Sequence, residues 1–249
     1  MIFSNIPSDF IGGLSYILRT NYKLYLEGAT FTLIIAITGT FIGLFVAMLI
    51  IIFRIQEKDP RDNGMNVLLK KLSVFFSTSY VEFFRGTPMM VQAAIFYYGL
   101  AMIGVRMPII VAGIIVVSLN TAAYLTEVLR SGINAIDKGQ MEAARAIGLS
   151  RAQAYRYIIF PQVIKNMVPA IGNELVVNIK DTAVLSVIGV SELFYMAKSV
   201  AGTHYRYTES FVLVALVYLI MVLITTRLLS LIIKLLNKEI VSIPTSQTV

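Results

Sequence analysis

Five long apolar stretches constrain the fold of this chain more than any other feature of its sequence. They cover residues 30–53, 80–103, 108–129, 166–188 and 211–233. A helix needs about 20 mostly apolar residues to cross the hydrocarbon core of a bilayer. Only 14% of the residues are charged, whereas in a soluble domain about a quarter are. We therefore expect an all-α integral membrane protein with five transmembrane helices, folded as one transmembrane domain over residues 24–236.

Two of these stretches are interrupted by polar side chains. Residues 80–103 contain Glu82, Arg85 and the string Gly86-Thr87-Pro88, and residues 166–188 contain Glu174, Asn178, Lys180 and Asp181. Charged residues inside a membrane span usually face a polar path or the protein interior. Gly86, Pro88 and Gly172 weaken their helices, so we expect bending there to gate a path. Arg85 is expected to hold the kinked second span in place.

The positions of Lys and Arg predict the orientation of the chain. Fourteen of the 21 fall in the segments 54–71, 130–165 and 227–238, on one side of the five spans, and five fall on the other side. Because cytoplasmic loops carry an excess of Lys and Arg, the richer side is predicted to be cytoplasmic. Five spans then place the N-terminus outside and the C-terminus inside.

The two ends of the chain are predicted to lie outside the membrane-spanning domain. In residues 1–23, apolar side chains recur on one helical face, which predicts an amphipathic helix at the extracytoplasmic interface. A basic leader and a small-residue cleavage site, which are typical of a signal peptide, are missing. Residues 237–249 are predicted to form a cytoplasmic tail.

The residue types exclude several classes of function. With no Cys and one His, the chain lacks a disulfide framework, and a metal site or a membrane-embedded enzyme is not expected. It has no P-loop, so we expect no cofactor in this chain, and ATP with Mg²⁺ would be bound by a partner subunit. The net charge of +7 comes from basic residues at the ends of apolar spans, so nucleic acid is not an expected partner.

The polar segment 134–161 lies between the third and fourth spans and is predicted to form a helix-turn-helix. The residues after Asp137 open a first short helix. Its apolar face is formed by Met141, Ala144 and Ile147. Gly148 can take the left-handed conformation that ends a helix, and Ser150 can cap the next one. Pro161 is predicted to end the second helix and to start the return to the membrane.

The string Glu142-Ala143-Ala144, followed by Gly148 and then by Phe160-Pro161, resembles the EAA loop of ABC importer permeases. Phe160 stands where that family usually has Leu, which keeps a hydrophobic contact. The resemblance implies the transmembrane domain of a type I ABC importer, whose loop docks on a separate ATPase subunit. The residues implied to contact the ATPase are Glu142, Ala143, Ala144, Gly148, Leu149 and Pro161.

Three further strings are similar to the polar amino-acid uptake branch of these permeases. They are Glu82-Phe83-Phe84-Arg85-Gly86-Thr87-Pro88, Asn120-Thr121-Ala122-Ala123-Tyr124, and Gly172-Asn173-Glu174 with Lys180-Asp181-Thr182. The resemblance implies a permease of the bacterial cytoplasmic membrane that pairs with a second permease subunit, identical or different, and with an ATPase dimer. It also implies an extracytoplasmic substrate-binding protein that delivers a polar amino acid.

The charged stripe of the fourth span is the predicted substrate site. Glu174, Asn178 and Asp181 are four and three residues apart, so they share one helical face. The resemblance places substrate contacts at the positions of Glu174 and Asp181, and two carboxylates suit a substrate with a cationic group. Neutral partners are predicted to be Gln92, Asn120, Thr121 and Tyr124. A structural alternative, in which Asp181 pairs with Arg85, stays open.

An ion-coupled secondary amino-acid transporter is the alternative function. It would use Glu174 and Asp181 to bind coupling ions. Such transporters are often built from repeated halves with broken helices, and this chain has no visible internal repeat. The carried amino acid is left open among glutamine, arginine, histidine, cystine and glutamate, with the two carboxylates disfavouring an acidic substrate.

Overall fold

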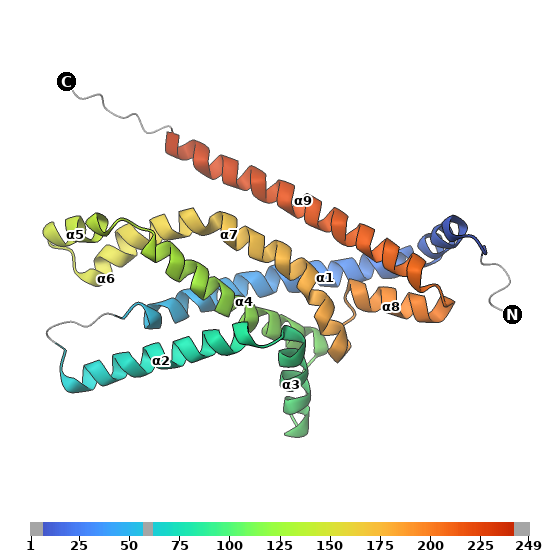
Figure 1. Ribbon diagram of the computed structural model, residues 1–249, viewed down its shortest axis with the longest axis horizontal. Coiled ribbons are helices and arrows are strands. Elements are labelled where there is room, and N and C mark those ends of the chain that lie inside the picture. The colour runs from blue at the N-terminus through green and yellow to red at the C-terminus, as the bar shows by residue number, and fades with distance from the viewer. Residues whose placement is uncertain (1–6, 57–61, 242–249) are drawn as a thin grey trace.

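The computed structural model describes residues 7–56 and 62–241, with side chains placed up to Leu235. Within these residues the chain forms helices and their connections (Figure 1). In order, the helices are α1 (Phe10–Arg54), α2 (Gly64–Gly86), α3 (Met89–Met102), α4 (Ile109–Asn134), α5 (Lys138–Ala146), α6 (Arg151–Ala154), the π-helix η1 (Tyr155–Ile159), α7 (Phe160–Asp181), the 3₁₀-helix η2 (Thr182–Ile188), α8 (Leu193–His204) and α9 (Tyr207–Val241).

The first helix, α1, runs unbroken for 45 residues. At 1.5 Å per residue it is about 68 Å long, more than twice the roughly 30 Å of bilayer hydrocarbon. It is therefore long enough to cross the membrane and to extend beyond it. The structure differs here from the predicted separate helix over residues 1–23, because no Pro interrupts residues 10–54 and the helix propagates through them. Residues 1–6 lie outside the described part of the chain.

Small residues on α1 allow α4 to pack closely against it. A Cβ atom at Gly39 would lie 2.5 Å from Val117 Cγ1, and one at Gly43 would lie 2.8 Å from Thr121 Cβ, so only glycine fits these two positions without movement. Lipid tails are as apolar as Leu, so helices in a membrane associate through such close packing rather than through hydrophobic burial. The α1–α4 contact forms the centre of the bundle.

The weak point predicted at Gly86 and Pro88 in the span over residues 80–103 is confirmed, and the chain there divides into two helices. The chain breaks between α2 and α3, where Thr87 has an extended backbone (φ −121°, ψ 147°). Pro88 causes the break, because proline has no N–H and disfavours the α conformation in the residue before it. Figure 1 shows α3 crossing the direction of α2. Tyr80 holds α2 to α4, since its hydroxyl donates a hydrogen bond to the Leu119 carbonyl (2.6 Å).

The predicted fourth span, 166–188, is longer and bent. α7 begins at Phe160, and the chain tightens into the 3₁₀-helix η2 at Thr182. Gly189, with φ 89°, ends η2. α8 then turns by 54° from the segment Arg151–Ile188. This span is therefore a bent pair of helices rather than one straight helix.

The predicted count of five membrane-crossing helices is not confirmed. Among the described residues, three helices are long and apolar enough, namely Phe10–Arg54, Ile109–Asn134 and Tyr207–Leu235, and the bent pair makes a fourth. α3 has only 14 residues, and α2 is not among the helices that are apolar enough. α9 continues to Val241, past the predicted start of the tail at residue 237, while residues 242–249 lie outside the described part.

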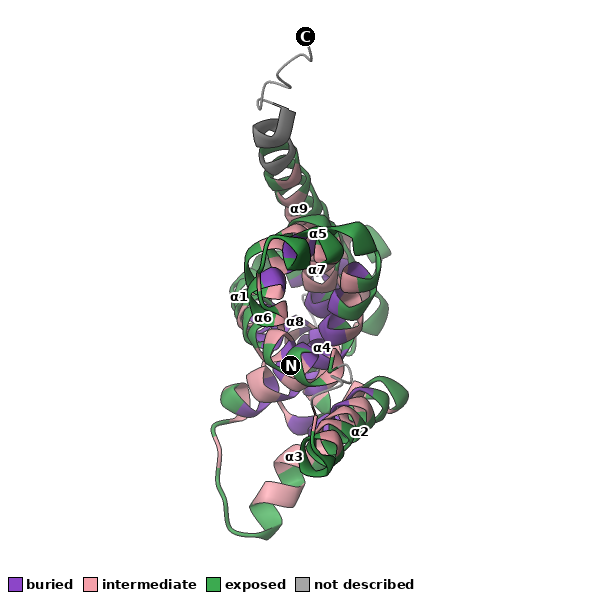
Figure 2. Cartoon of the chain, turned by 90° about the vertical axis from the view of Figure 1, so that its left-hand side faces the viewer, coloured by how far each residue is buried: buried purple, intermediate pink, exposed green. Residues whose placement is uncertain are grey.

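The buried residues gather where α1, α4, α7 and α8 meet, as the end-on view of Figure 2 shows. In that view α2 and α3 lie to one side of the bundle, and α9 leaves it on the other side. The outer face of α9 carries exposed apolar side chains, including Leu219, Leu223, Leu231 and Leu235. Such a face suits contact with lipid.

Candidate functional site

α5 and α6 form a compact hairpin between the end of α4 and the start of α7 (Figure 1). α5 ends in a Schellman motif around Gly148, which has φ 88°. The Gly148 N–H donates to the Arg145 carbonyl (3.1 Å), and the Leu149 N–H donates to the Ala144 carbonyl (3.1 Å). These two bonds satisfy carbonyls that a helix end leaves without partners. The predicted left-handed turn at Gly148 is confirmed.

Polar side chains cap both helices of the hairpin. Asp137 Oδ1 accepts a hydrogen bond from the Gly139 N–H (2.7 Å) and opens α5. Ser150 opens α6 with a capping box, in which the Gln153 N–H donates to Ser150 Oγ (3.3 Å) and the Ser150 N–H donates to Gln153 Oε1 (2.8 Å). The predicted helix-turn-helix is confirmed, and its shape is set by local hydrogen bonds.

The exposed surface of the hairpin combines small residues with one large apolar side chain. Glu142, Ala143 and Gly148 are exposed, Leu149 is half-buried and Ala144 is buried. Ile147, which was predicted to share the apolar face of α5 with Met141 and Ala144, is 76% exposed. Ile147 is the C-cap residue of α5, and its N–H donates to the Ala143 carbonyl (3.2 Å).

Pro161 does not end a helix, contrary to the prediction. α6, η1 and α7 follow one another without an intervening loop from Arg151 to Asp181, and Pro161 lies in the first turn of α7. The π-helical turn η1 just before it widens the spacing of the backbone hydrogen bonds, with the Phe160 N–H donating to the Tyr155 carbonyl. The altered hydrogen-bond pattern of the π-turn allows the helical segment to continue through Pro161, although proline has no N–H to donate.

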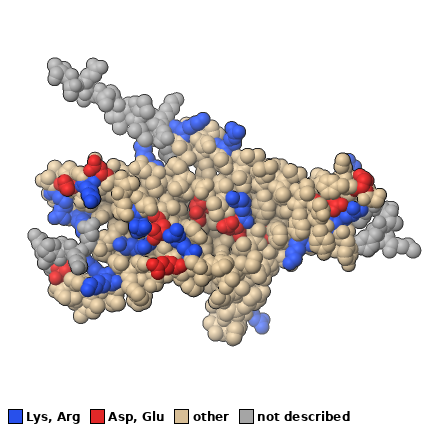
Figure 3. All heavy atoms as spheres, in the orientation of Figure 1, with Lys and Arg blue, Asp and Glu red and all other residues tan. Residues whose placement is uncertain are grey.

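A cluster of ion pairs ties α1 to α4 at the same end of the molecule. Glu127 pairs with Arg54 of α1 and, 2.8 Å away, with Arg130 of its own helix. The pair of Glu127 and Arg130 follows from their spacing of three residues on one helix, whereas the bridge to Arg54 depends on how α1 and α4 pack. Figure 3 shows charged side chains concentrated at this end, around the hairpin and the start of α2.

Two of the predicted substrate residues, Asn178 and Thr121, form a buried contact between helices. The Asn178 side-chain amide donates to Thr40 Oγ1 (2.8 Å) and to Thr121 Oγ1 (2.9 Å). Asn178 is 3% exposed and Thr121 is fully buried. The structure thus brings α1, α4 and α7 together at this amide.

Two other predicted substrate residues, Gln92 and Asn120, stabilise the break between α2 and α3. The Gln92 amide donates to the carbonyls of Phe84 and Thr87 (2.9 Å each). Asn120 donates to Gln92 Oε1 (3.0 Å) and to the Phe84 carbonyl (3.2 Å). These bonds satisfy carbonyls that the break leaves without backbone donors.

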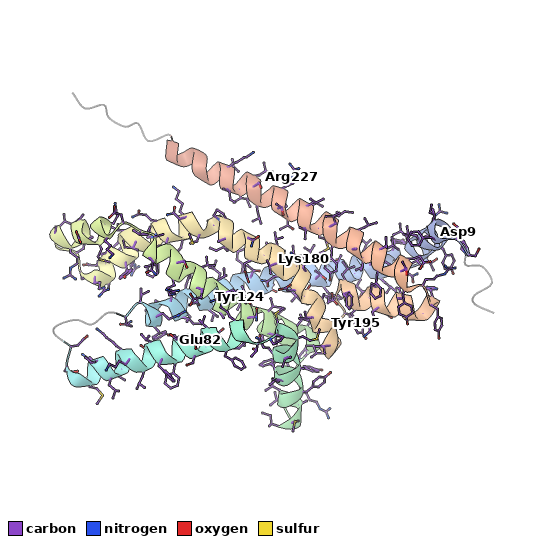
Figure 4. The ribbon with its side chains drawn as sticks, viewed as in Figure 1. Asp9, Glu82, Tyr124, Lys180, Tyr195 and Arg227 are labelled. Atoms are coloured by element: carbon purple, nitrogen blue, oxygen red, sulfur yellow. The ribbon has the colours of Figure 1, made fainter. Side chains whose placement is uncertain are left out.

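Glu174 and Asp181 lie on α7, two helical turns apart. Glu174 is half-buried and Asp181 is exposed. Tyr124 on α4 is 38% exposed, and the Arg85 guanidinium carbon lies 5.4 Å from the centre of its ring. Arg85 therefore contacts Tyr124 rather than forming the pair with Asp181. Figure 4 labels Tyr124 on α4 and Lys180 on α7.

The predicted bending points differ in what surrounds them. Gly86 and Pro88 lie at the break between α2 and α3, and no heavy atom would lie within 4 Å of a Cβ at Gly86. Gly172 is buried, and a Cβ there would lie 2.9 Å from Leu229 Cδ2 of α9. α7 continues through Gly172 without interruption, so glycine serves close packing at this position. Gating at these residues stays a prediction.

A buried carboxylate that the sequence analysis did not single out lies at the start of α8. Glu192 is fully buried and accepts hydrogen bonds from the Phe194 and Tyr195 N–H groups (2.8 and 2.7 Å) and from the Tyr218 hydroxyl (3.0 Å). The sequence signal was an acidic residue just before an apolar helix, the usual place of an N-cap. Glu192 joins α8 to α9.

The helical bundle has a polar hairpin at its charged end and carboxylates along one of its membrane helices. Both features are consistent with a single family of membrane proteins. Residues 64–241 match the model of the binding-protein-dependent transport system inner membrane component. The chain belongs to this family. Its fold is that of the transmembrane domain of a type I ABC importer, and it is a multi-pass integral membrane permease of the amino-acid ABC transporters.

The relatives and solved structures agree with this assignment. The chain is 35% identical over 202 residues to the arginine transport system permease protein ArtQ of Bacillus subtilis (strain 168), covering 81% of this chain and 87% of ArtQ. It is 34% identical over 229 residues to the putative glutamine transport system permease protein GlnP of Rickettsia conorii, covering 91% and 98% of the two chains.

This chain is similar to a chain in a crystal structure of an amino acid ABC transporter with histidines. The match covers 92% of this chain and 99% of the solved chain, with a TM-score of 0.77 and 35% sequence identity. The inward-facing MetNI methionine ABC transporter matches 87% of this chain and 98% of its own, with a TM-score of 0.72 and 18% identity. The second likeness shows the shared fold alone.

Proposed function

We propose that this chain is the permease subunit of an ATP-driven, binding-protein-dependent importer of a polar amino acid. The observation that carries the proposal is the α5–α6 hairpin, a short polar element whose turn and caps are held by local hydrogen bonds. It joins α4 to α7, the helix that carries Glu174 and Asp181. Membership of the family supports the same function.

In this proposal the hairpin docks on a separate ATPase subunit, which holds ATP and Mg²⁺. Ala143 and Gly148 permit a close approach, Glu142 pairs with a basic residue of the ATPase, and the exposed Ile147 is covered on docking. Closure of an ATPase dimer on ATP would move the hairpin together with α4 and α7 and open the path outward. Hydrolysis would return the path to its inward-open state.

We assign substrate contact to Glu174, Asp181 and Tyr124. The two carboxylates offer acceptors for the ammonium group that every amino acid carries, and the exposed ring of Tyr124 offers a hydroxyl. The amides of Gln92, Asn120 and Asn178 are bonded to neighbouring helices. Two relatives are named as permease proteins of an arginine transport system and of a putative glutamine transport system, which supports a polar amino acid as substrate.

The proposed assembly contains a second permease subunit, an ATPase dimer and an extracytoplasmic substrate-binding protein in a bacterial cytoplasmic membrane. The excess of Lys and Arg near the hairpin supports a cytoplasmic position for it. The N-terminus would then lie outside and the C-terminus inside. An ion-coupled secondary transporter is not favoured, because the matching family and structures are ABC transporters.

The test is uptake of a panel of labelled polar amino acids by proteoliposomes that hold the permease, its co-purifying ATPase and trapped ATP. Glu174→Gln and Asp181→Asn are compared with wild type, with Glu27→Gln, an exposed carboxylate on α1, as matched control. We expect one class of amino acid to be taken up only with ATP. Both site variants should lose uptake while ATP hydrolysis persists, and the control should behave as wild type.

Uptake that persists without the ATPase and follows an ion gradient would overturn the proposal in favour of a secondary transporter. Full uptake in both site variants would remove the assignment of Glu174 and Asp181.

A further inference from the structure

The amide of Asn178 uses its hydrogen-bonding groups within the protein. Nδ2 has two hydrogens, and it donates to Thr40 Oγ1 (2.8 Å) and to Thr121 Oγ1 (2.9 Å). The Thr121 hydroxyl lies 3.3 Å from Asn178 Oδ1, as a donor to it. The three residues are 3%, 5% and 0% exposed for Asn178, Thr40 and Thr121. A ligand in the path therefore finds no donor left on this amide.

We infer that Asn178 is a positioning residue, which fixes the rotation of α7 about its axis so that Glu174 and Asp181 face the translocation path. This inference rests on the proposed function. Asn178 lies one turn after Glu174 and one turn before Asp181. At about 100° per residue, the three side chains span an arc of only about 60°. The bonded amide thus sits at the edge of the stripe that carries the two carboxylates.

The membrane makes this rotation costly to change. Where water is excluded, an amide turned away from Thr40 and Thr121 has no other partner and keeps an unsatisfied polar group. The Thr121 side chain is itself confined, because it lies against Gly43 of α1, where a Cβ would be 2.8 Å from Thr121 Cβ. The acceptors that Asn178 needs are therefore held in place by the close packing of α1 and α4.

The same contact connects the proposed site to the hairpin. Thr121 lies on α4 and Asn178 on α7, the two helices that the α5–α6 hairpin joins. Because the amide bonds these helices together beside Glu174 and Asp181, movement of the hairpin reaches the carboxylates through a unit of two coupled helices. Loss of the bond would leave the hairpin intact and loosen only the orientation of α7.

Thr121→Val tests the inference, because it removes the hydroxyl and keeps the branched shape. The matched control is Thr126→Val. Thr126 is also fully buried on α4, but its hydroxyl donates to the Ala122 carbonyl of its own helix (2.6 Å). Thr121→Ser restores the hydroxyl and serves as the rescue variant, and Asn178→Leu removes the amide itself.

Two measurements separate orientation from general stability. The chain has no Cys, so a single Lys180→Cys, which lies about 100° around α7 from Asp181, reports a change in the rotation of α7 through its rate of reaction with a water-soluble maleimide. An interhelical hydrogen bond in a membrane contributes only a modest free energy. We therefore expect Thr121→Val to change the maleimide reaction rate by about three- to tenfold and to raise the apparent KM for uptake by about the same factor. Maximal ATP hydrolysis should stay unchanged, and Thr121→Ser should behave as wild type.

The inference is overturned if Thr121→Val leaves both the maleimide rate and the KM at wild-type values, or if Thr126→Val changes them equally. A changed maleimide rate with an unchanged KM would keep the role of the amide in orienting α7. The unchanged KM would show that the orientation of α7 does not affect substrate binding, and this would remove the proposed substrate contacts of Glu174 and Asp181. If Asn178→Leu does not fold, the comparison of the two Thr→Val variants still decides the question.

Discussion

Replacing Gly148 by Ala should weaken binding of the ATPase by opposing the turn of the hairpin. Gly148 has φ 88°, and no heavy atom lies within 4 Å of the position a Cβ would take. The cost is therefore confined to the backbone, where an L-residue in the left-handed region costs about 1–2 kcal/mol. A change of this size shifts an equilibrium by a factor of about 5–30. Asn tolerates this conformation better, so Gly148→Asn should lose less affinity than Gly148→Ala.

The assay is a titration of the purified permease with its ATPase in detergent. Gly104→Ala is the matched control, because Gly104 also has a positive φ of 82° and no neighbour within 4 Å, but lies in the turn between α3 and α4. We expect wild-type affinity for Gly104→Ala. Equal losses in both variants, or an unchanged affinity in Gly148→Ala, would refute the argument that the shape of this turn controls docking.

Three further substitutions probe the packing of the bundle by thermal melting in detergent. Gly39→Val should destabilise the protein by about 1–3 kcal/mol through overpacking against α4. Gly99→Val should not, because no heavy atom lies within 4 Å of the position of its Cβ. Similar losses of stability in the two variants would contradict the close α1–α4 contact. Gln92→Ala should cost about 1–3 kcal/mol, because the Thr87 carbonyl at the α2–α3 break loses its side-chain donor, whereas the Phe84 carbonyl keeps Asn120; an unchanged melting temperature would contradict this role of Gln92. Glu127→Ala should lower the melting temperature, since Arg54, with a 12% exposed side chain, loses its counter-charge; a melting temperature as high as wild type would count against that ion pair.

The hairpin could be predicted from the sequence because its determinants act over a few residues. Asp137, Gly148 and Ser150 each bond to backbone groups two to five residues away or supply a backbone conformation that few residues adopt. Pro161 was the exception. A proline is normally a helix terminator, but the π-turn of η1 accommodates it inside a continuous helical segment.

The roles of the polar membrane residues could not be predicted in the same way. Helical spacing correctly placed Glu174, Asn178 and Asp181 on one face of α7, but it could not identify their partners. Asn178 bonds to Thr40, which is 138 residues away, and to Thr121, which is 57 residues away. Gln92 and Asn120 also interact across helices, at a separation of 28 residues.

By itself, the sequence determined that this chain is a helical membrane protein with a polar hairpin, since apolar length, capping residues and glycine conformations are local properties. Only the tertiary structure decided how the interrupted spans bend and which polar side chains hold helices together instead of remaining open to a ligand. The reason is that a side chain in the membrane must find its partner within the protein, and that partner depends on which helices become neighbours.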